Sequence, residues 1–338
     1  MSAPVLGVYG SPTPLWEKGE TLPSLGVNAV FTGSGTIADD LLRRCADEKA
    51  AVYAEFATFR GDHVVDQRPD LWPIGEDGER VRRSPRFIGL CPGDAAWKAE
   101  RLATLGELVR RAAPRGLAGI WIDYLHFHCD FELPQPTLDQ TCFDDRCLAD
   151  FQRHSRLNVP GGGRADQVRW IMASAPEAWV DWKCATMTAF AGEIRSAAEA
   201  AARAVGAARP LIGLYGCPWT DQEYDGGIRR VCGEDLEQLA SVVDVFSPMV
   251  YHRKCGRPVS WPGTYASWLV RRLPRSLVWP IVDVQDAPAD EARQVLAEGL
   301  AASQSAGASG GVMPFATYYL AEDAGRLAAL REVYRRAH

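Results

Sequence analysis

The chain has 338 residues, of which 47% are hydrophobic and 24% charged, and its formal net charge is −6. This composition is typical of a globular protein with an ample core, and the acidic balance gives no support to general nucleic-acid binding. No apolar run approaches membrane-spanning length, and residues 1–10 contain no cationic stretch before an apolar run, so neither a membrane span nor a signal peptide is predicted.

The cysteines indicate a reducing compartment. There are nine of them, an odd number, and their spacing does not resemble a disulfide framework. Reduced thiols are the rule in the cytosol, so we expect a cytoplasmic location.

Short apolar runs alternate with helical patterns along the whole chain. The predicted strands are 6–10, 27–33, 51–59, 119–127, 211–219, 244–251, 278–284 and 310–317. Helical patterns begin near Thr36 and cover 94–113, 176–205, 234–240, 264–273, 289–305 and 321–336. This alternation predicts a single (β/α)₈ TIM barrel over residues 1–338. An open doubly wound sheet is the alternative, but no glycine-rich phosphate turn follows an early strand.

Two long segments interrupt the regular alternation. Residues 60–93 follow the third predicted strand, and residues 128–175 follow the fourth. Both would lie at the C-terminal mouth of a barrel, where catalytic side chains gather. Long loops in a compact domain are commonly lids or binding loops, so we expect these segments to border a site.

One carboxylate interrupts the apolar run 117–128. The alternation of side chains places Trp121, Asp123 and Leu125 on one face of the predicted strand. A carboxylate in such a strand must be paired, hydrogen-bonded or placed at an opening to solvent. Asp123 could instead cap the next helix or pair with an arginine, but its position favours a catalytic role.

Polar and aromatic residues recur at the ends of the predicted strands. Aromatic rings stack on sugar faces, polar groups bind hydroxyls, and glycosidic cleavage uses two carboxyl groups. We therefore predict a glycoside hydrolase that needs no cofactor and acts on a small-molecule or oligosaccharide substrate. The catalytic candidates are Asp123, Glu55 and Asp283, and the candidates for substrate binding are Tyr9, Arg60, Trp219, Asp225, Tyr251, His252 and Gln285.

Glu55 and Asp123 are the preferred catalytic pair because they lie on adjacent predicted strands. Tyr53 shares a face with Glu55, just as Trp121 shares one with Asp123. If both faces point inward, the carboxyl groups lie roughly 5–8 Å apart, a range that does not choose between retention and inversion. We expect Glu55 to keep the proton and act as the general acid. Asp283, across the barrel, is the competing partner.

Several stretches resemble a known group of enzymes: Cys91-Pro92-Gly93-Asp94, residues 119–124, residues 142–151 and residues 243–252. They are similar to putative glycoside hydrolases of the TIM-barrel superfamily, related to bacterial β-galactosidases and α-amylase-like barrels. The resemblance implies a nucleophilic role for Asp123. The chain lacks the Asn-Glu pair that those β-galactosidases carry at the fourth strand, so their acid/base assignment does not transfer.

The resemblance also bears on metal binding. In the β-galactosidase relatives, a C-x-C-x-x-C segment and an upstream cysteine can bind zinc. Here Asp144 occupies the middle position between Cys142 and Cys147, and Cys91 is the upstream cysteine. Zinc accepts a carboxylate beside thiolates, but the altered pattern resembles a degraded site, and no metal is predicted.

Other functions remain open at this point. His126 and His128 form an H-x-H pattern, which some metal-dependent barrel hydrolases use, although on their first strand. A non-catalytic sugar-binding barrel is a further alternative. Arginines cluster in one segment and could bind an acidic sugar, although a solvated loop explains them better: Arg60, Arg68, Arg80, Arg82, Arg83 and Arg86. The oligomeric state is left undetermined.

Overall fold

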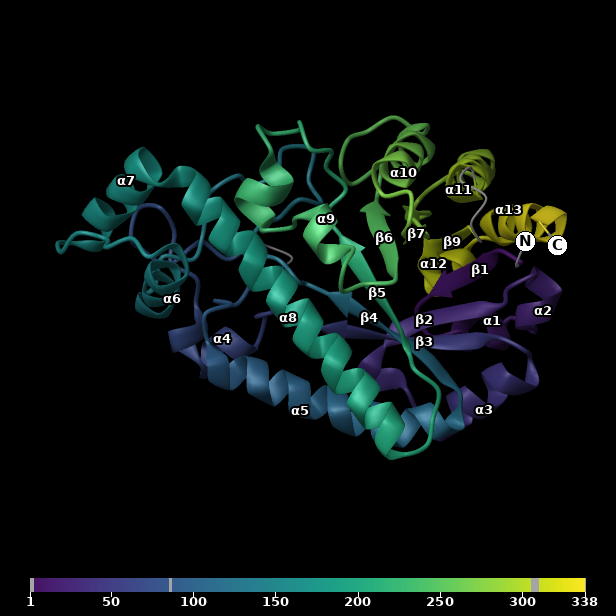
Figure 1. Cartoon of the computed structure of the whole chain (residues 1–338). Helices are drawn as coiled ribbons and strands as arrows, with labels where there is room; N and C mark the ends of the chain where they lie inside the picture. Colours follow the sequence, from purple (N-terminus) through teal and green to yellow (C-terminus); the bar gives the residue numbers. More distant parts are fainter. Residues whose placement is uncertain (1–2, 85–86, 305–309, 338) are drawn as a thin grey trace.

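The protein is a closed parallel barrel surrounded by helices (Figure 1). The computed structural model describes residues 3–84, 87–304 and 310–337. The strands are β1 (Val5–Tyr9), β2 (Ala29–Gly33), β3 (Ala51–Ala57), β4 (Leu117–Asp123), β5 (Leu211–Gly216), β6 (Val245–Val250), β7 (Leu277–Val278), β8 (Ile281–Asp283) and β9 (Gly311–Phe315). Pairing of β5 with β6 closes the sheet, which confirms the predicted (β/α)₈ barrel.

The seventh barrel strand consists of two pieces, β7 and β8. Both pair in parallel with β6, and only β8 also pairs with β9. Trp279 and Pro280 separate the pieces. Proline has no backbone N–H to donate to the ladder, which accounts for the break. The two pieces together occupy one barrel position.

The longer helices follow the predicted patterns closely. Asp94 caps α5 by accepting a hydrogen bond from the Trp97 backbone N–H at 2.6 Å. The pattern predicted over 321–336 is divided into α12 and α13, and residue 305 of another predicted helix lies outside the described residues. The helices are α1 (Thr13–Glu17), α2 (Leu22–Leu25), α3 (Asp39–Asp47), α4 (Val64–Gln67), α5 (Ala95–Ala112), α6 (Asp145–Ser155), α7 (Arg164–Ser174), α8 (Pro176–Ala204), α9 (Leu236–Leu239), α10 (Trp261–Arg272), α11 (Ala289–Gln304), α12 (Thr317–Glu322) and α13 (Ala324–Ala337).

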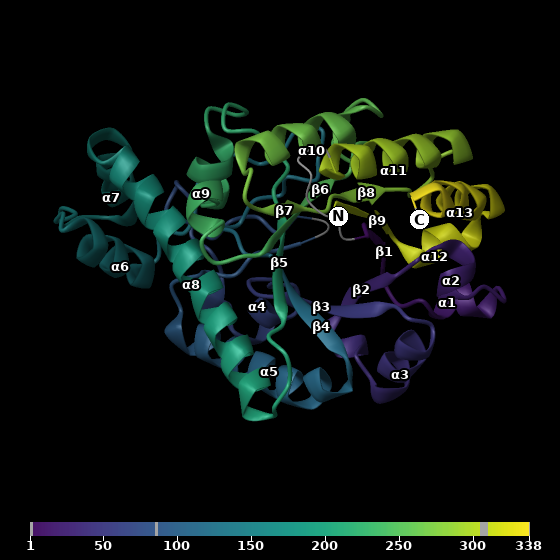
Figure 2. The ribbon, with the colours of Figure 1, turned by 45° about the vertical axis from the view of Figure 1, so that its right-hand side comes forward.

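The two long segments lie after β3 and β4, as predicted, but the second is largely helical. It contains α6 and α7, which protrude at one side of the barrel in Figures 1 and 2. No helix in the described ranges is both long and apolar enough to cross a membrane.

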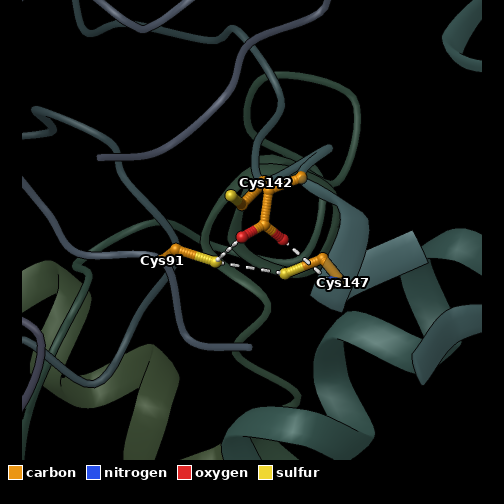
Figure 3. A group of neighbouring side chains, drawn as sticks. Cys91, Cys142 and Cys147 are labelled. Atoms are coloured by element: carbon orange, nitrogen blue, oxygen red, sulfur yellow. Dashed lines mark hydrogen bonds between the residues drawn. The ribbon is translucent and has the colours of Figure 1, made fainter. Parts of the chain in front are cut away.

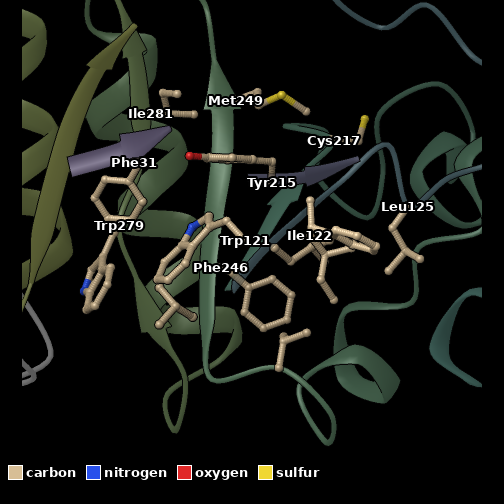
Figure 4. Close-up of a cluster of buried hydrophobic side chains, with 14 of the residues drawn as sticks. Phe31, Trp121, Ile122, Leu125, Tyr215, Cys217, Phe246, Met249, Trp279 and Ile281 are labelled. Atoms are coloured by element: carbon tan, nitrogen blue, oxygen red, sulfur yellow. The ribbon is translucent and has the colours of Figure 1, made fainter. Parts of the chain in front are cut away.

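A layer of aromatic rings fills the barrel below its mouth (Figure 4). Tyr53 and Trp121 lie with ring centroids 4.7 Å apart, and Trp121 stacks on Trp279 at 5.5 Å. Strand glycines make room for these rings: a Cβ at Gly213 would lie 2.1 Å from the Trp121 ring. Because Tyr53 and Trp121 face inward, so do Glu55 and Asp123 two residues further on.

Candidate active site

A cavity of about 280 Å³ opens at the C-terminal ends of the barrel strands. Carboxylates, basic groups and aromatic rings all line it, which is the combination that a sugar site needs. The lining residues are Tyr9, Glu55, Arg60, Phe87, Asp123, Tyr124, His126, Cys129, Asp130, Phe131, Glu132, Tyr215, Met249, Tyr251, Lys254, Ile281 and Phe315.

Asp123 is the last residue of β4, and the strand ends earlier than the sequence predicts. The predicted strand extends to residue 127, but Tyr124 has a φ of +56° and ends it. The Tyr124 backbone N–H donates to Asp123 Oδ1 at 2.8 Å, and the Thr58 hydroxyl donates to the Asp123 carbonyl oxygen at 2.8 Å. The side chain is thus fixed at the mouth of the barrel.

Glu55 reaches the same place from β3. The Tyr9 hydroxyl donates a hydrogen bond to Glu55 Oε2. Burial raises the pKa of Asp123 well above its usual range, and the charge of Glu55 together with a side-chain hydrogen bond between the two carboxyl groups adds to the rise. The two carboxyl groups therefore share one small space inside the barrel mouth.

Tyrosine rings and two basic side chains complete the cavity. Lys254 Nζ lies 3.0 Å from Glu132 Oε2 and 4.3 Å from the centre of the Tyr251 ring. Arg60 forms an ion pair with Asp62 and lies over the Tyr124 ring at 5.4 Å. Charged hydrogen-bonding groups and flat apolar surfaces therefore face the same space.

Burial also sets the protonation of the tyrosines in the cavity. It raises the pKa of Tyr9, with the charge of Glu55 as a further cause, and it raises the pKa of Tyr215. Both phenols are therefore neutral hydrogen-bond donors at physiological pH.

The H-x-H histidines belong to an aromatic wall. Burial lowers the pKa of His126 and of His128 to about 4, so both imidazoles are neutral near pH 7. Phe87 lies 5.8 Å from the His126 ring and 5.3 Å from the His128 ring. The Gly89 backbone N–H donates to His128 Nδ1 at 3.0 Å. Neither histidine belongs to a group of potential metal ligands among the described residues.

Four of the predicted substrate-binding residues lie outside the cavity. β5 ends at Gly216, before Trp219, whose ring packs behind the cavity residue Phe131. His252 is 2% exposed and its Nε2 lies 2.8 Å from Glu291 Oε1. The other two are Asp225, which borders a separate surface hollow, and Gln285, which is not among the lining residues.

Asp283, the alternative catalytic residue, is also absent from the cavity lining. Its carboxylate is buried and accepts a hydrogen bond from the Gln285 backbone N–H at 2.9 Å. Burial raises the pKa of Asp283. The structure thus leaves Asp283 behind the cavity wall, and the predicted site residues that it brings together are Tyr9, Glu55, Arg60, Asp123 and Tyr251.

Several lining residues are not among the predicted site residues. Asp130, Phe131 and Glu132 lie in the long segment after β4, where no periodicity indicates which side chains point inward. Tyr215 lies in the middle of the predicted fifth strand, 211–219, and comes near a strand end only because β5 stops at Gly216. Lys254 lies in the turn after β6, beyond the reach of strand periodicity.

A second cluster lies beside the barrel mouth, where the two long segments meet (Figure 3). The ligand atoms of Cys91, Cys142, Asp144 and Cys147 all lie within 4.8 Å of one another, and the three cysteines are buried. Cys91 Sγ lies 3.4 Å from Cys147 Sγ and 3.2 Å from Asp144 Oδ2. Three thiols and a carboxylate converging on one point fit a structural zinc ion, although the sequence pattern alone does not favour a metal.

Asp144 has other partners besides the thiols. Its Oδ1 caps α6 by accepting from the Cys147 backbone N–H at 2.8 Å, and its Oδ2 accepts from Arg146 Nε at 2.8 Å. The carboxylate is thus held in place from two sides, with Oδ2 turned toward Cys91.

Comparisons with known proteins support the fold. No protein-family model matches the chain, and no curated protein matches it. The chain is similar to the glycoside hydrolase domain of PgaB (BpsB) from Bordetella bronchiseptica, with a TM-score of 0.66 and 14% identity, over 95% of this chain and 92% of that one.

Two β-galactosidase structures are similar as well. One is Gan42B, a GH42 β-galactosidase from G. stearothermophilus, with a TM-score of 0.67 and 10% identity over 100% of this chain and 57% of that one. The other is the β-galactosidase from the psychrophilic Marinomonas ef1, with a TM-score of 0.66 and 11% identity over 97% of this chain and 58% of that one. The chain spans little more than half the length of these β-galactosidases. The resemblance to glycoside hydrolase barrels is confirmed at the level of the fold.

Proposed function

We propose that the protein is a glycoside hydrolase in which Glu55 and Asp123 carry out the reaction. The observation that carries this proposal is that two carboxylic residues on adjacent, paired strands, Glu55 and Asp123, line one cavity at the barrel mouth. Glycosidic cleavage needs one carboxyl group that is protonated and one that is ionised. When two carboxyl groups are neighbours in a buried site, one tends to stay protonated while the other is ionised, because two negative charges close together repel each other.

Asp123 is the proposed general acid. Its raised pKa and its depth in the cavity support a protonated side chain. Glu55 accepts a hydrogen bond from the Tyr9 hydroxyl and is the proposed ionised partner. These roles reverse the expectation from the sequence, in which Asp123 is the nucleophile and Glu55 the acid.

The proposed reaction retains the anomeric configuration. An inverting site holds its carboxyl groups ~6.5–9.5 Å apart to admit a water, whereas a retaining site holds them ~5–5.5 Å apart. Glu55 and Asp123 come from adjacent, directly paired strands and line the same cavity, which supports the shorter separation. Glu55 then forms a bond to the anomeric carbon while the bond between that carbon and the leaving oxygen breaks. Asp123 gives its proton to the leaving oxygen. Water, deprotonated by Asp123, next attacks the anomeric carbon and releases Glu55.

The remaining cavity residues would bind and orient the sugar. The aromatic side chains in the lining, Tyr251 and Phe315 among them, would supply apolar contacts, while Arg60 and Lys254 offer charged donors for hydroxyl or acidic groups.

Beside the site, Cys91, Cys142, Asp144 and Cys147 would hold a zinc ion. Such an ion would cross-link the segment after β3 to the start of α6 and take no part in the chemistry.

A screen of nitrophenyl glycosides and reducing-end assays on oligosaccharides test this function. We expect wild-type turnover on at least one sugar, and losses of ~10² to 10⁴ in kcat for both Asp123→Asn and Glu55→Gln. Asp283→Asn, outside the cavity, is the matched control and should retain most of the activity. A folded Asp123→Asn protein with full turnover would disprove the assignment.

A further inference from the structure

Two adjacent tyrosines lie just outside the cavity, at the start of α12. Tyr318 and Tyr319 follow β9 directly, so they lie on the C-terminal face of the barrel, where the cavity opens. Within the described part of the chain, two large apolar side chains are exposed, and Tyr318 is the more exposed of them, at 43%. The other, Val205, follows α8 and precedes β5, which places it at the opposite end of the barrel.

Ring contacts connect these tyrosines to the catalytic cavity. Tyr9 and Phe315, both in the cavity lining, stack with centroids 5.0 Å apart. The Phe315 ring lies 6.2 Å from Tyr319, and Tyr319 lies 4.1 Å from Tyr318. An unbroken row of rings thus runs from Tyr9, the hydrogen-bond partner of Glu55, to the protein surface.

Polar groups accompany the outer end of this row. Burial raises the pKa of Tyr319, and its contact with Tyr318 and the nearby charges of Asp283 and Asp286 add to the rise. Asp286 is exposed and Gln285 beside it is half-buried. A ring face with a carboxylate nearby suits a sugar, which has an apolar face and a rim of hydroxyl donors.

We propose that Tyr318 and Tyr319 form an outer sugar-binding platform. The platform binds a second or later unit of a saccharide chain whose scissile bond lies between Glu55 and Asp123. This inference rests on the proposed function and narrows its substrate class from glycosides in general to oligosaccharides or polysaccharides.

Binding measurements test the platform without depending on turnover. The probes are cello-, chito-, xylo- and mannohexaose with the matching monosaccharides, titrated by calorimetry into the Asp123→Asn protein. We expect at least one hexasaccharide to bind more tightly than its monosaccharide. In the same background, Tyr318→Ala should weaken that hexasaccharide about 10-fold, while Tyr318→Phe, which keeps the ring, should restore most of the affinity. Val205→Ala is the matched surface control and should change nothing.

Kinetics separate the failure of this inference from failure of the proposed function. On an aryl monoglycoside, which does not extend to the platform, Tyr318→Ala should leave kcat/KM within about 2-fold of wild type. Equal affinity of wild type and Tyr318→Ala for every hexasaccharide, or no preference for hexasaccharides over monosaccharides, would overturn the platform and leave the catalytic pair standing. Full turnover by Asp123→Asn would instead overturn the proposed function.

Discussion

Two carboxyl groups of similar chemistry, Asp123 and Glu55, have different surroundings, and the roles we propose for them follow from that difference. Asp123 is buried at the end of β4, where the backbone N–H of Tyr124 donates to its side chain. Glu55 extends toward Tyr9, whose hydroxyl donates to it. Burial penalises the charged form of Asp123, and the neighbouring Glu55 penalises it further. The proposed mechanism therefore places the proton on Asp123.

This burial predicts a stabilising effect of Asp123→Asn. Because the pKa of Asp123 is raised in the folded protein, the folded state keeps a proton that the unfolded chain releases above pH ~4. Stability is thus lost as the pH rises from that value toward the folded pKa, at up to about 1.4 kcal/mol per pH unit. Asparagine has no proton to lose and keeps a similar shape.

Thermal unfolding between pH 4 and pH 8 measures this effect. We expect the Tm of Asp123→Asn to exceed that of wild type near neutral pH, with the difference shrinking toward pH 4. A wild-type Tm that is higher than that of the variant at pH 7, with the same difference at pH 4, would show that Asp123 carries no buried proton.

Inside the barrel, a glycine on one strand leaves the space that an aromatic ring on the neighbouring strand occupies. Gly213 on β5 faces Trp121 on β4, and the Trp121 indole N–H donates to Ser247 Oγ on β6 at 2.9 Å. A methyl group at Gly213 would meet the six-membered part of the indole at 2.1 Å. This close packing leaves the Trp121 ring little freedom to move. Trp121 lies two residues before Asp123 on the same strand, so the fixed ring lies directly beneath the site.

Gly213→Ala should therefore destabilise the barrel by about 1–3 kcal/mol through overpacking. The matched control is Gly161→Ala, because a Cβ at Gly161 would meet nothing within 4 Å and the residue has no positive φ. Urea unfolding of the two variants measures the difference. Equal stability of both variants would show that Trp121 repacks freely and that the aromatic layer does not constrain the site.

The sequence predicts the elements well where periodicity determines structure. Alternating apolar residues identify all eight barrel positions, and the position of Asp123 near a strand end points to the mouth. Strand ends are less predictable, because a single left-handed residue, Tyr124, ends β4 and the chain leaves β5 at Gly216. This early departure explains why Trp219 lies behind the cavity.

The loop residues of the site could not be predicted in the same way. Glu132 and Lys254 lie in segments without regular periodicity, and they meet only because the segments after β4 and β6 fold over the same mouth. Of the clustered arginines, Arg60 lines the cavity, Arg68 and Arg83 pair with surface aspartates, and Arg86 lies outside the described residues. Sequence patterns report local geometry, whereas these contacts depend on the closed barrel.

Across the molecule as a whole, the cysteine cluster connects two distant parts of the chain. Cys91 lies near the end of the segment after β3, while Cys142, Asp144 and Cys147 surround the start of α6. All nine cysteines are free and buried, so no disulfide performs this task. A zinc ion would hold both segments against the barrel and supply folding free energy.

Metal analysis and unfolding test this cross-link together. Mass spectrometry of the native protein, prepared without chelators, should show about one zinc per chain. Removing the zinc with a strong chelator should lower the Tm. Cys147→Ser should lose the metal and most of the Tm response. Cys45→Ser, a buried cysteine on α3 outside the cluster, is the control and should retain both. Metal-free wild type with an unchanged Tm in added zinc would contradict the assignment.

The proposed roles of Asp123 as general acid and Glu55 as nucleophile can be separated by the dependence of rate on the leaving group. A dinitrophenyl glycoside leaves without protonation, whereas an alkyl glycoside requires an acid. For the sugar that the screen identifies, Asp123→Asn should form the glycosyl-enzyme from the dinitrophenyl substrate at near wild-type rate and lose ~10² to 10⁴ on the alkyl one. Glu55→Gln should lose activity on both. Equal losses of Asp123→Asn on the two substrates, with Glu55→Gln still active, would contradict these roles.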